Sequence, residues 1–192
     1  IYHEHFSYLS LLAVDTIFAS NGLHIFNVAE FPTHGGSLRV FAQRADRAVR
    51  PRNATVAAML ARERAIGMAG PAWYGTLQLA AERIKHDLLA FLVTEKRAGR
   101  TVAGYGAAAK GNTLLNWAGV RPDLLPWVAD ANPAKQGKRL PGSRILVSAP
   151  ERLAVERPDT VLILPWNLRD EIRALLGGGQ RIAIAVPRLE VT

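Results

Sequence analysis

Hydrophobic and polar positions divide the chain into two stretches that differ in organisation. Over residues 1–44, helical spacing after Ser10 is followed by two strand-like runs, at residues 23–28 and 37–42. These patterns predict one capped helix and an antiparallel pair of strands. Because one helix and two strands cannot bury a core of their own, this stretch is expected to complete a sheet that begins elsewhere in a longer polypeptide.

Residues 45–55 are rich in arginine and contain Pro51, a composition that is typical of a linker. Helical periodicity then predicts one helix over about residues 54–69 and a longer one over about residues 73–98. Residues 56–192 are therefore expected to form a domain of their own.

From Arg100 onward, short apolar runs alternate with helical segments. Such alternation indicates a parallel, doubly wound sheet. The predicted fold is thus α/β, a Rossmann-like domain preceded by a helix and an antiparallel β-pair. The expected strands lie at residues 101–103, 125–129, 144–147, 160–164 and 181–186, and the expected helices at residues 107–117 and 168–176.

Composition narrows the classes of protein and partner. The chain has no cysteine, which excludes disulfides and thiolate chemistry within it and fits a cytoplasmic location. No apolar run approaches the ~18 residues of a membrane-spanning helix. The net charge of +8 and the pI of about 10.4 favour an anionic partner, either nucleic acid or a nucleotide diphosphate. An arginine-rich composition can also simply reflect a GC-rich genome.

A glycine-rich turn between a predicted strand and a predicted helix is the first candidate site. The sequence from Gly104 through Gly106 to Ala109 fits G-x-G-x-x-A, in which glycines permit a tight turn and the close approach of a ligand. Asp130 ends the next strand roughly 20 residues later, where such sites hold a ribose hydroxyl. Lys110 follows the turn directly and either reaches a phosphate or lies on the helix surface. The pattern indicates the Rossmann-like fold more strongly than it indicates a bound dinucleotide.

The second candidate is the run Tyr2-His3-Glu4-His5, which places two imidazoles, a carboxylate and a phenol together. Each group can transfer protons near neutral pH in a suitable environment. The same residues could instead be hydrogen-bonded structural groups at the end of a strand. His24 and His34 are isolated and carboxylates are sparse nearby, so no metal site is predicted.

The third candidate is the segment from His34 to Arg39, His-Gly-Gly-Ser-Leu-Arg. Its glycines would let the backbone approach a ligand, and Arg39 or Ser37 could bind an anion. A tight connection between two strands explains the same residues equally well.

Several motifs in one order carry a resemblance to a known family. They are YHEHFSY at residues 2–8, PTHGGSLR at 32–39, GYGAAAKGNT at 104–113 and DANPAKQG at 130–137, followed by Leu140-Pro141-Gly142. The chain resembles the carboxy-terminal part of the S-adenosylmethionine-dependent sugar C-methyltransferases, which methylate C3 of nucleotide-linked 4-keto-6-deoxysugars.

The resemblance implies how the chain fits into such an enzyme. Residues 1–44 would be the tail of the middle domain, a class I methyltransferase domain. Residues 56–192 would be the carboxy-terminal domain, which follows the linker. The donor, S-adenosylmethionine, would be bound mainly by upstream domains of the same polypeptide, and a cysteine-rich amino-terminal domain would bind zinc. The sugar nucleotide, expected to be a dTDP-sugar, would lie in the cleft between domains. Neither a membrane nor nucleic acid is implied as a partner.

The resemblance also implies roles for single residues. His5 would remove the proton at C3, which the C4 ketone acidifies, and the resulting enolate would attack the donor methyl group. Tyr2 and Glu4 would orient the base, hold a sugar hydroxyl or carry the proton onward. The residues expected to bind the substrate are His34, Arg39, Gly104, Gly106, Lys110, Asn112 and Asp130.

Two other classes of function remain open at this point. A nucleotide-binding or regulatory module could use the segment from Gly104 to Asp130 without chemistry of its own. A basic nucleic-acid-binding protein would explain the charge, but the chain has no recognised motif of that class and only 7% aromatic residues.

Overall fold

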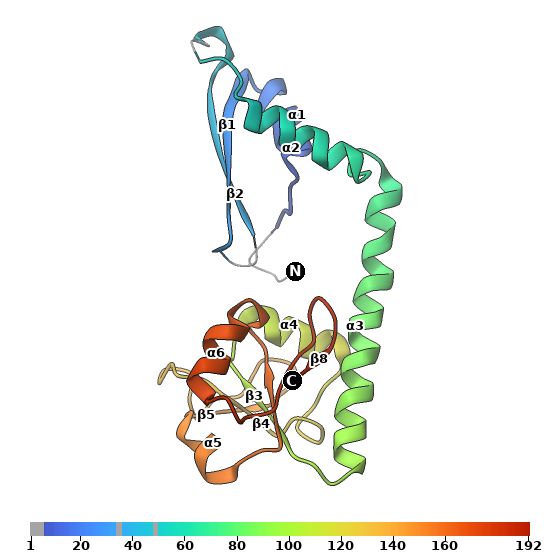
Figure 1. Cartoon of the computed structure of the whole chain (residues 1–192), viewed down its shortest axis with the longest axis vertical. Helices are drawn as coiled ribbons and strands as arrows, with labels where there is room; N and C mark the ends of the chain where they lie inside the picture. The colour runs from blue at the N-terminus through green and yellow to red at the C-terminus, as the bar shows by residue number, and fades with distance from the viewer. Residues whose placement is uncertain (1–5, 34–35, 48–49) are drawn as a thin grey trace. The chain divides into compact units, whose positions relative to one another are not determined.

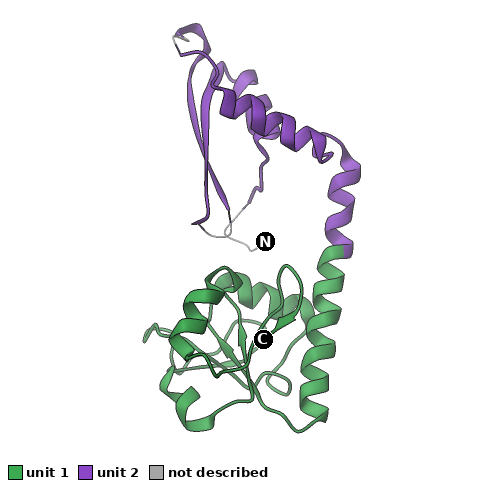
Figure 2. Ribbon diagram, in the orientation of Figure 1, with its two compact units in different colours: residues 1–4, 80–192 green, residues 5–79 purple. Residues whose placement is uncertain are grey.

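Figure 1 shows the whole chain as a computed structural model. The structure describes residues 6–33, 36–47 and 50–192. The chain divides into two compact units, one over residues 5–79 and the other over residues 80–192, and the boundary falls inside a helix (Figure 2). Each unit is described by itself.

The amino-terminal unit holds one hairpin and the helices that follow and precede it. Strands β1 (Leu23–Phe31) and β2 (Ser37–Arg44) pair antiparallel, with an irregularity in register between Ile25 and Asn27. Their sheet has only these two strands among the described residues. The predicted helix and antiparallel pair at the start of the chain are therefore confirmed.

A small core joins the hairpin to helices α1 (Leu11–Ser20) and α2 (Ala54–Ala65). Ser10 caps α1 as expected, because its hydroxyl oxygen accepts a hydrogen bond from the Ala13 amide. The core consists of buried residues from all of these elements: Leu11, Ile25, Val28, Val56, Met59 and Leu60.

The packing of α2 differs from the predicted domain division. The sequence placed residues from 56 onward with the second domain, whereas Val56, Met59 and Leu60 are buried against the hairpin and α1. Helical periodicity shows that α2 has an apolar side, but it does not show which sheet that side covers. The single-turn helix η2 (Ala45–Arg47) lies in the expected linker.

The carboxy-terminal unit is built on a six-stranded sheet with the strand order β5-β4-β3-β6-β7-β8. All neighbouring strands pair in parallel except β7 and β8, which are antiparallel. The predicted α/β class with a mostly parallel sheet is confirmed. The strands are β3 (Val102–Tyr105), β4 (Trp127–Ala129), β5 (Leu146–Ser148), β6 (Thr160–Ile163), β7 (Ile182–Ile184) and β8 (Glu190–Val191).

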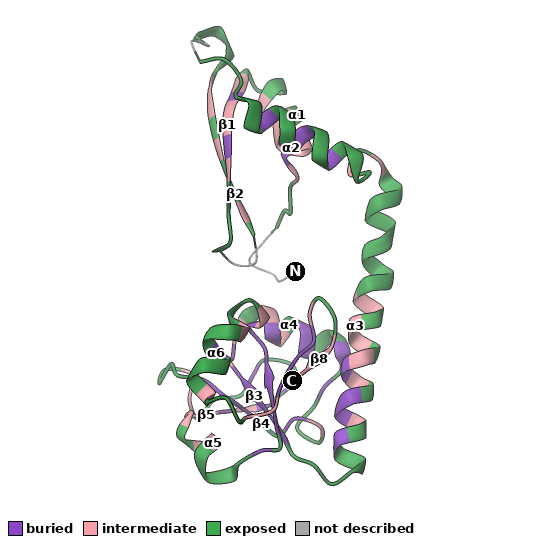
Figure 3. Cartoon of the chain, viewed as in Figure 1, coloured by how far each residue is buried: buried purple, intermediate pink, exposed green. Residues whose placement is uncertain are grey.

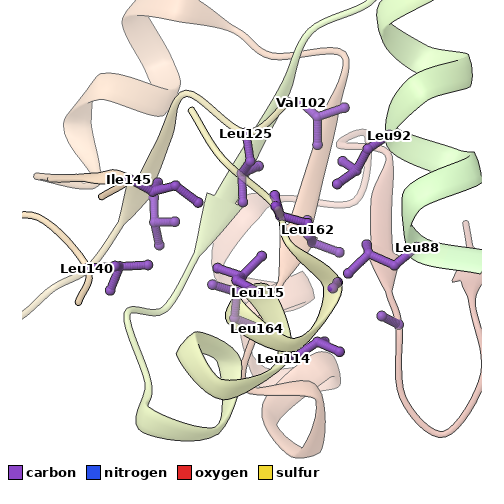
Figure 4. Close-up of a cluster of buried hydrophobic side chains, with 14 of the residues drawn as sticks. Leu88, Leu92, Val102, Leu114, Leu115, Leu125, Leu140, Ile145, Leu162 and Leu164 are labelled. Atoms are coloured by element: carbon purple, nitrogen blue, oxygen red, sulfur yellow. The ribbon is translucent and has the colours of Figure 1, made fainter. Parts of the chain in front are cut away.

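Helices cover both faces of this sheet. Against one face pack α3 (Pro71–Arg97) and α4 (Ala109–Ala118), which contribute residues such as Leu88, Leu92 and Leu115 to a large apolar cluster (Figure 4). Helices α5 (Glu151–Glu156) and α6 (Arg169–Leu176) pack against the other face. The single-turn helix η3 (Trp166–Leu168) immediately precedes α6.

Burial changes along α3. The part from Leu88 to Glu95 carries buried residues, whereas Leu77 and Leu79 are exposed (Figure 3). The long helix thus packs on the sheet only through its carboxy-terminal half. In the part of the chain that the structure describes, no helix has the length and apolar character needed to cross a membrane.

Candidate functional site

The glycine turn joins the end of β3 to the start of α4. Gly106 has φ +85°, a conformation that side chains with a Cβ rarely adopt, and an added Cβ would lie 2.5 Å from Cδ of Pro165. At Gly104 an added Cβ would lie 2.7 Å from Cγ2 of Val128. The space beside both glycines is therefore filled by the protein's own side chains.

Asp130 lies directly after β4, beside this turn, and is buried. Its Oδ2 accepts a hydrogen bond from the Ala107 amide at 2.7 Å, and its Oδ1 accepts one from the Asn132 amide at 2.8 Å. The sequence predicted Asp130 as an acid that binds a ribose. In the structure this carboxylate holds the turn, and its role towards a ribose stays a prediction.

Lys135 completes this arrangement and was not singled out as a site residue. Its ammonium group lies 3.2 Å from Oδ2 of Asp130 and donates to the Ala107 carbonyl oxygen at 2.9 Å. Gln136 adds a hydrogen bond from its side-chain amide to the Asp130 carbonyl oxygen, at 3.0 Å. A sugar hydroxyl at Asp130 would thus share an oxygen that already has partners.

Lys110 lies in the first turn of α4. Its ammonium group donates to the side-chain oxygen of Asn167 and lies 4.7 Å from the centroid of the Trp166 ring. Burial lowers the pKa of Lys110 below its ordinary value, because desolvation disfavours the charged form. No carboxylate pairs with it among the described residues.

The start of α4 can receive an anion beside Lys110. The residue before the helix, Ala108, has no side chain that could cap the first amides. Unpaired amides and the helix dipole attract negative charge. An anion bound there would also offset the desolvation of the Lys110 ammonium.

Asn112, another predicted binding residue, is engaged along its own helix. Its side-chain oxygen accepts a hydrogen bond from the side-chain nitrogen of Asn116 at 3.2 Å. The same nitrogen also donates to the carbonyl oxygen of Pro141. These contacts tie α4 to the loop after β4. The structure therefore gives Asn112 a visible role in packing, and its role in binding stays a prediction.

Tyr105, at the end of β3, was not predicted as a site residue. It is buried and lines a hollow of about 640 Å³, together with residues of α5 and α6. Burial, and secondly the negative charge of Asp130, raise the pKa of its phenol. Within the described part of the chain its hydroxyl makes no hydrogen bond. Its place between the two glycines of the turn is the signal by which the sequence could have indicated it.

Arg39 lies on β2, in the amino-terminal unit. Its guanidinium carbon lies 4.6 Å from the centroid of the exposed Phe31 ring, and the residue is exposed. Four predicted residues, Tyr2, Glu4, His5 and His34, lie outside the described residues. Their roles stay predictions, as does that of Arg39.

Among the described residues, no three histidine, aspartate or glutamate side chains are grouped so that they could hold a metal ion.

Comparison with known proteins assigns the chain to a family. A family described as the C-methyltransferase C-terminal domain matches residues 32–187. The chain belongs to this family. It is also 40% identical, over 197 aligned residues, to the C-methyltransferase NovU of Streptomyces niveus. The alignment covers 100% of the chain and 46% of NovU, so the chain spans about half the length of this relative.

The family match covers most of the elements described above. The match begins in the hairpin, at residue 32, and continues through the whole parallel sheet to residue 187. It therefore includes the glycine turn, Lys110, and Asp130 with its partners. The C-methyltransferase relationship implies S-adenosylmethionine as methyl donor. Among the described residues, no acidic residue stands at the end of β3.

Proposed function

We propose that the chain acts as the carboxy-terminal part of an enzyme that methylates C3 of a nucleotide-linked 4-keto-deoxysugar, with S-adenosylmethionine as donor. The family match over residues 32–187 carries the proposal. The ordered motifs at residues 2–8, 32–39 and 104–113 support the finer assignment to a sugar substrate.

The chemistry requires a base. A carbon atom must become nucleophilic before it can accept a methyl group, and the ketone at C4 makes the proton at C3 acidic. His5 removes that proton, and Tyr2 and Glu4 orient the imidazole or carry the proton onward. For this role His5 must be neutral before the reaction, so activity should fall as the pH is lowered through the pKa of His5. Bound S-adenosylmethionine supplies the electrophilic methyl group.

The substrate's diphosphate is held at the start of α4. Lys110 and the uncapped amides of the first helical turn support this assignment, because a cation and a helix amino terminus both favour phosphate oxygens. Pro165 fills the side of Gly106 from which a Cβ would project. The diphosphate is therefore assigned to the first turn of α4, beside Lys110.

A nucleotide-binding module without chemistry is the second candidate, and the same Lys110 site would support it. A dinucleotide is disfavoured, because Asp130 is already bonded to Ala107, Asn132 and Lys135. The two candidates differ in one observable step, removal of the proton at C3.

Exchange of the C3 proton in D₂O tests the proposal. The enzyme with its donor-binding part is incubated with a dTDP-linked 4-keto-6-deoxysugar, and loss of the C3 proton signal is followed by NMR against a blank without enzyme. His5→Ala should lower the exchange rate by about 100-fold or more, the range expected for loss of a general base. His86→Ala, which removes an exposed histidine from α3, should leave the rate unchanged.

Two results would contradict the proposal in different ways. Exchange at the unaltered rate in the His5→Ala variant would exclude His5 as the base. If the unaltered enzyme binds dTDP but neither exchanges the C3 proton nor methylates the sugar, the module without chemistry would be the better description.

A further inference from the structure

The hollow beside Tyr105 lies on the face of the sheet that α5 and α6 cover, opposite to α4. Both helices are short, with six and eight residues. Residues of the two helices and of the loop after α6 line the hollow, together with Tyr105 at the end of β3. Its volume of about 640 Å³ falls within the roughly 300–1,000 Å³ of sites that hold small molecules.

Tyr105 brings an unpaired hydroxyl group to this hollow. The residue is 7% exposed, and its hydroxyl makes no hydrogen bond in the part of the chain that the structure describes. A buried phenol normally has a hydrogen-bond partner, because the loss of water around its hydroxyl is otherwise uncompensated. The phenol stays protonated at neutral pH, since burial and the charge of Asp130 raise its pKa. It therefore offers a donor to an acceptor group in the hollow.

Arg157, directly after α5, supplies a cation to the same hollow. Among the described residues it is the one charged residue of the lining, and it forms no ion pair. Its Nε donates to the Ala154 carbonyl oxygen at 3.4 Å, so both terminal nitrogens of the guanidinium remain available. Glu156 and Asp159, the carboxylates nearest in sequence, are hydrogen-bonded to other residues. The free fork of a guanidinium can hold both oxygens of a carboxylate.

The loop after α6 adds backbone donors. Gly178 and Gly179 line the hollow, and their amides donate to no group within the described ranges of the chain. An added Cβ at either position would meet nothing within 4 Å, so a ligand can approach the backbone there. Carbonyl groups at the end of a helix repel an anion, but the amides of Arg157 and Gly177 already donate to such groups in the last turns of α5 and α6.

Apart from these polar groups, much of the lining is apolar. Leu153 and Leu176 are half-buried and pack against the core cluster on this face of the sheet. Leu175 also lines the hollow and is 70% exposed. The apolar part of a ligand would remove this surface from water, which favours binding.

We propose that this hollow is a second ligand site, which takes a small organic carboxylate with an apolar body. The carboxylate binds to Arg157 and to the amides of Gly178 and Gly179, and an acceptor group on the body binds to the Tyr105 hydroxyl. The site is separate from the one proposed for the diphosphate, because Lys110 is not part of its lining and α4 covers the other face of the sheet. It does not depend on the role of the chain in methylation.

Titration with dansylglycine tests the proposal in the enzyme with its donor-binding part, with S-adenosylmethionine and dTDP both present at saturating concentration. This probe has a naphthalene ring, sulfonyl oxygens that accept hydrogen bonds, and a carboxylate, and its fluorescence rises in an apolar environment. It should bind at a single site. Dansylamide, which lacks the carboxylate, should bind about tenfold more weakly, the loss expected for a charge-assisted hydrogen bond.

Arg157→Gln isolates the contact with the carboxylate. This variant should weaken dansylglycine binding by about tenfold and leave dansylamide binding within about twofold of the unaltered enzyme. Arg173→Gln is the matched control, since it removes an exposed arginine of α6 that does not line the hollow. It should leave the affinities of both probes within about twofold, because exposed charges that make no direct contact contribute little.

Two further variants test the inner part of the hollow. Tyr105→Phe removes only the hydroxyl and should weaken the binding of both probes by about threefold, the loss of one neutral hydrogen bond. Ala154→Trp places a large ring at an exposed position of the lining and should abolish the binding of both.

Three results would overturn the proposal. Equal affinity for dansylglycine in Arg157→Gln and Arg173→Gln would show that the probe binds elsewhere. Binding that appears only when dTDP is left out would place the probe in the diphosphate site. The absence of saturable binding would exclude a site of this chemistry. Should Tyr105→Phe or Ala154→Trp not fold, Arg157→Gln still decides the question, because its side chain is exposed.

Discussion

Single glycines of the turn are explained by what packs against them. The pattern G-x-G-x-x-A indicated that residues 104 and 106 need to be glycine, for a tight turn and for the close approach of a ligand. Val128 and Pro165 fill the space that a Cβ would occupy at these two positions, and the approach of a ligand stays a prediction. These partners come from later strands and loops, so a sequence pattern can show that space is needed without showing what occupies it.

Gly106→Ala should therefore destabilise the carboxy-terminal unit. The variant forces a Cβ against Pro165 and a residue with a side chain into a left-handed conformation, which together should cost about 2 kcal/mol or more of unfolding free energy. Urea unfolding measures this loss. Gly178→Ala is the control, since an added Cβ there meets nothing within 4 Å; equal stability of the two variants would show that the turn tolerates a side chain.

Lys110 should contribute to binding the diphosphate. Lys110→Ala should weaken dTDP binding, measured by calorimetric titration, by about tenfold or more, the loss expected for a charged hydrogen bond of roughly 1.5–3 kcal/mol. Lys85→Ala is a close control, because its ammonium group also lies over a tryptophan ring, 5.1 Å from the centroid of Trp117. Equal affinity for dTDP in both variants would remove Lys110 from the site.

Individual elements are held together by contacts that periodicity does not reveal. Glu95, near the end of α3, accepts hydrogen bonds from Arg100 at 2.7 and 2.9 Å and from Arg181 at 2.7 Å. Arg181 also donates to the hydroxyl of Thr160, at the start of β6. This buried carboxylate thus ties the long helix to the strands that it covers.

The same cluster predicts how stability depends on pH. Arg100 above all, and Arg181 after it, lower the pKa of Glu95 from 4.5 to about 2. A pKa that is lowered in the folded state means stabilisation that is complete above pH 4.5 and is lost as the pH falls towards 2. Across this range the unfolding free energy of the unaltered chain should fall more steeply than that of Glu95→Gln. Glu171→Gln, at an exposed position of α6, should keep the steep dependence, and identical slopes in all three proteins would contradict the assignment.

The sequence predicted most elements of the carboxy-terminal unit. Helix α3 and the strands β3, β6 and β7 were expected because they lie within apolar runs that show a period or a clear boundary. Helix α5, with six residues, and β8, with two, were not expected, because such lengths carry no measurable period. The antiparallel pairing of β8 with β7 depends on the path of the preceding loop.

The candidate site was predictable in its residue types and less so in its connections. Lys110 and Asp130 were identified from their positions beside a glycine turn. Lys135 was missed as their companion, because its contact with Asp130 depends on the turn formed by the intervening loop.

At the scale of the whole molecule, the two units differ in the size of their sheets. The carboxy-terminal unit has a sheet with helices on both faces, whereas the sheet of the amino-terminal unit has only two strands among the described residues. The chain belongs to the C-methyltransferase C-terminal domain family and spans about half of NovU. Under the proposed function, another part of the polypeptide binds the donor and this chain binds the substrate's diphosphate.

Transfer of a labelled methyl group to a dTDP-linked 4-keto-6-deoxysugar tests the central claim most directly. The enzyme with its donor-binding part is supplied with methyl-labelled S-adenosylmethionine, and the product is located by NMR in the unaltered protein and in His5→Ala. The label should appear at C3 and turnover should fall by about 100-fold or more in the variant. A label at any other atom, or equal turnover in the two proteins, would contradict the claim that this chain supplies the base for methylation at C3.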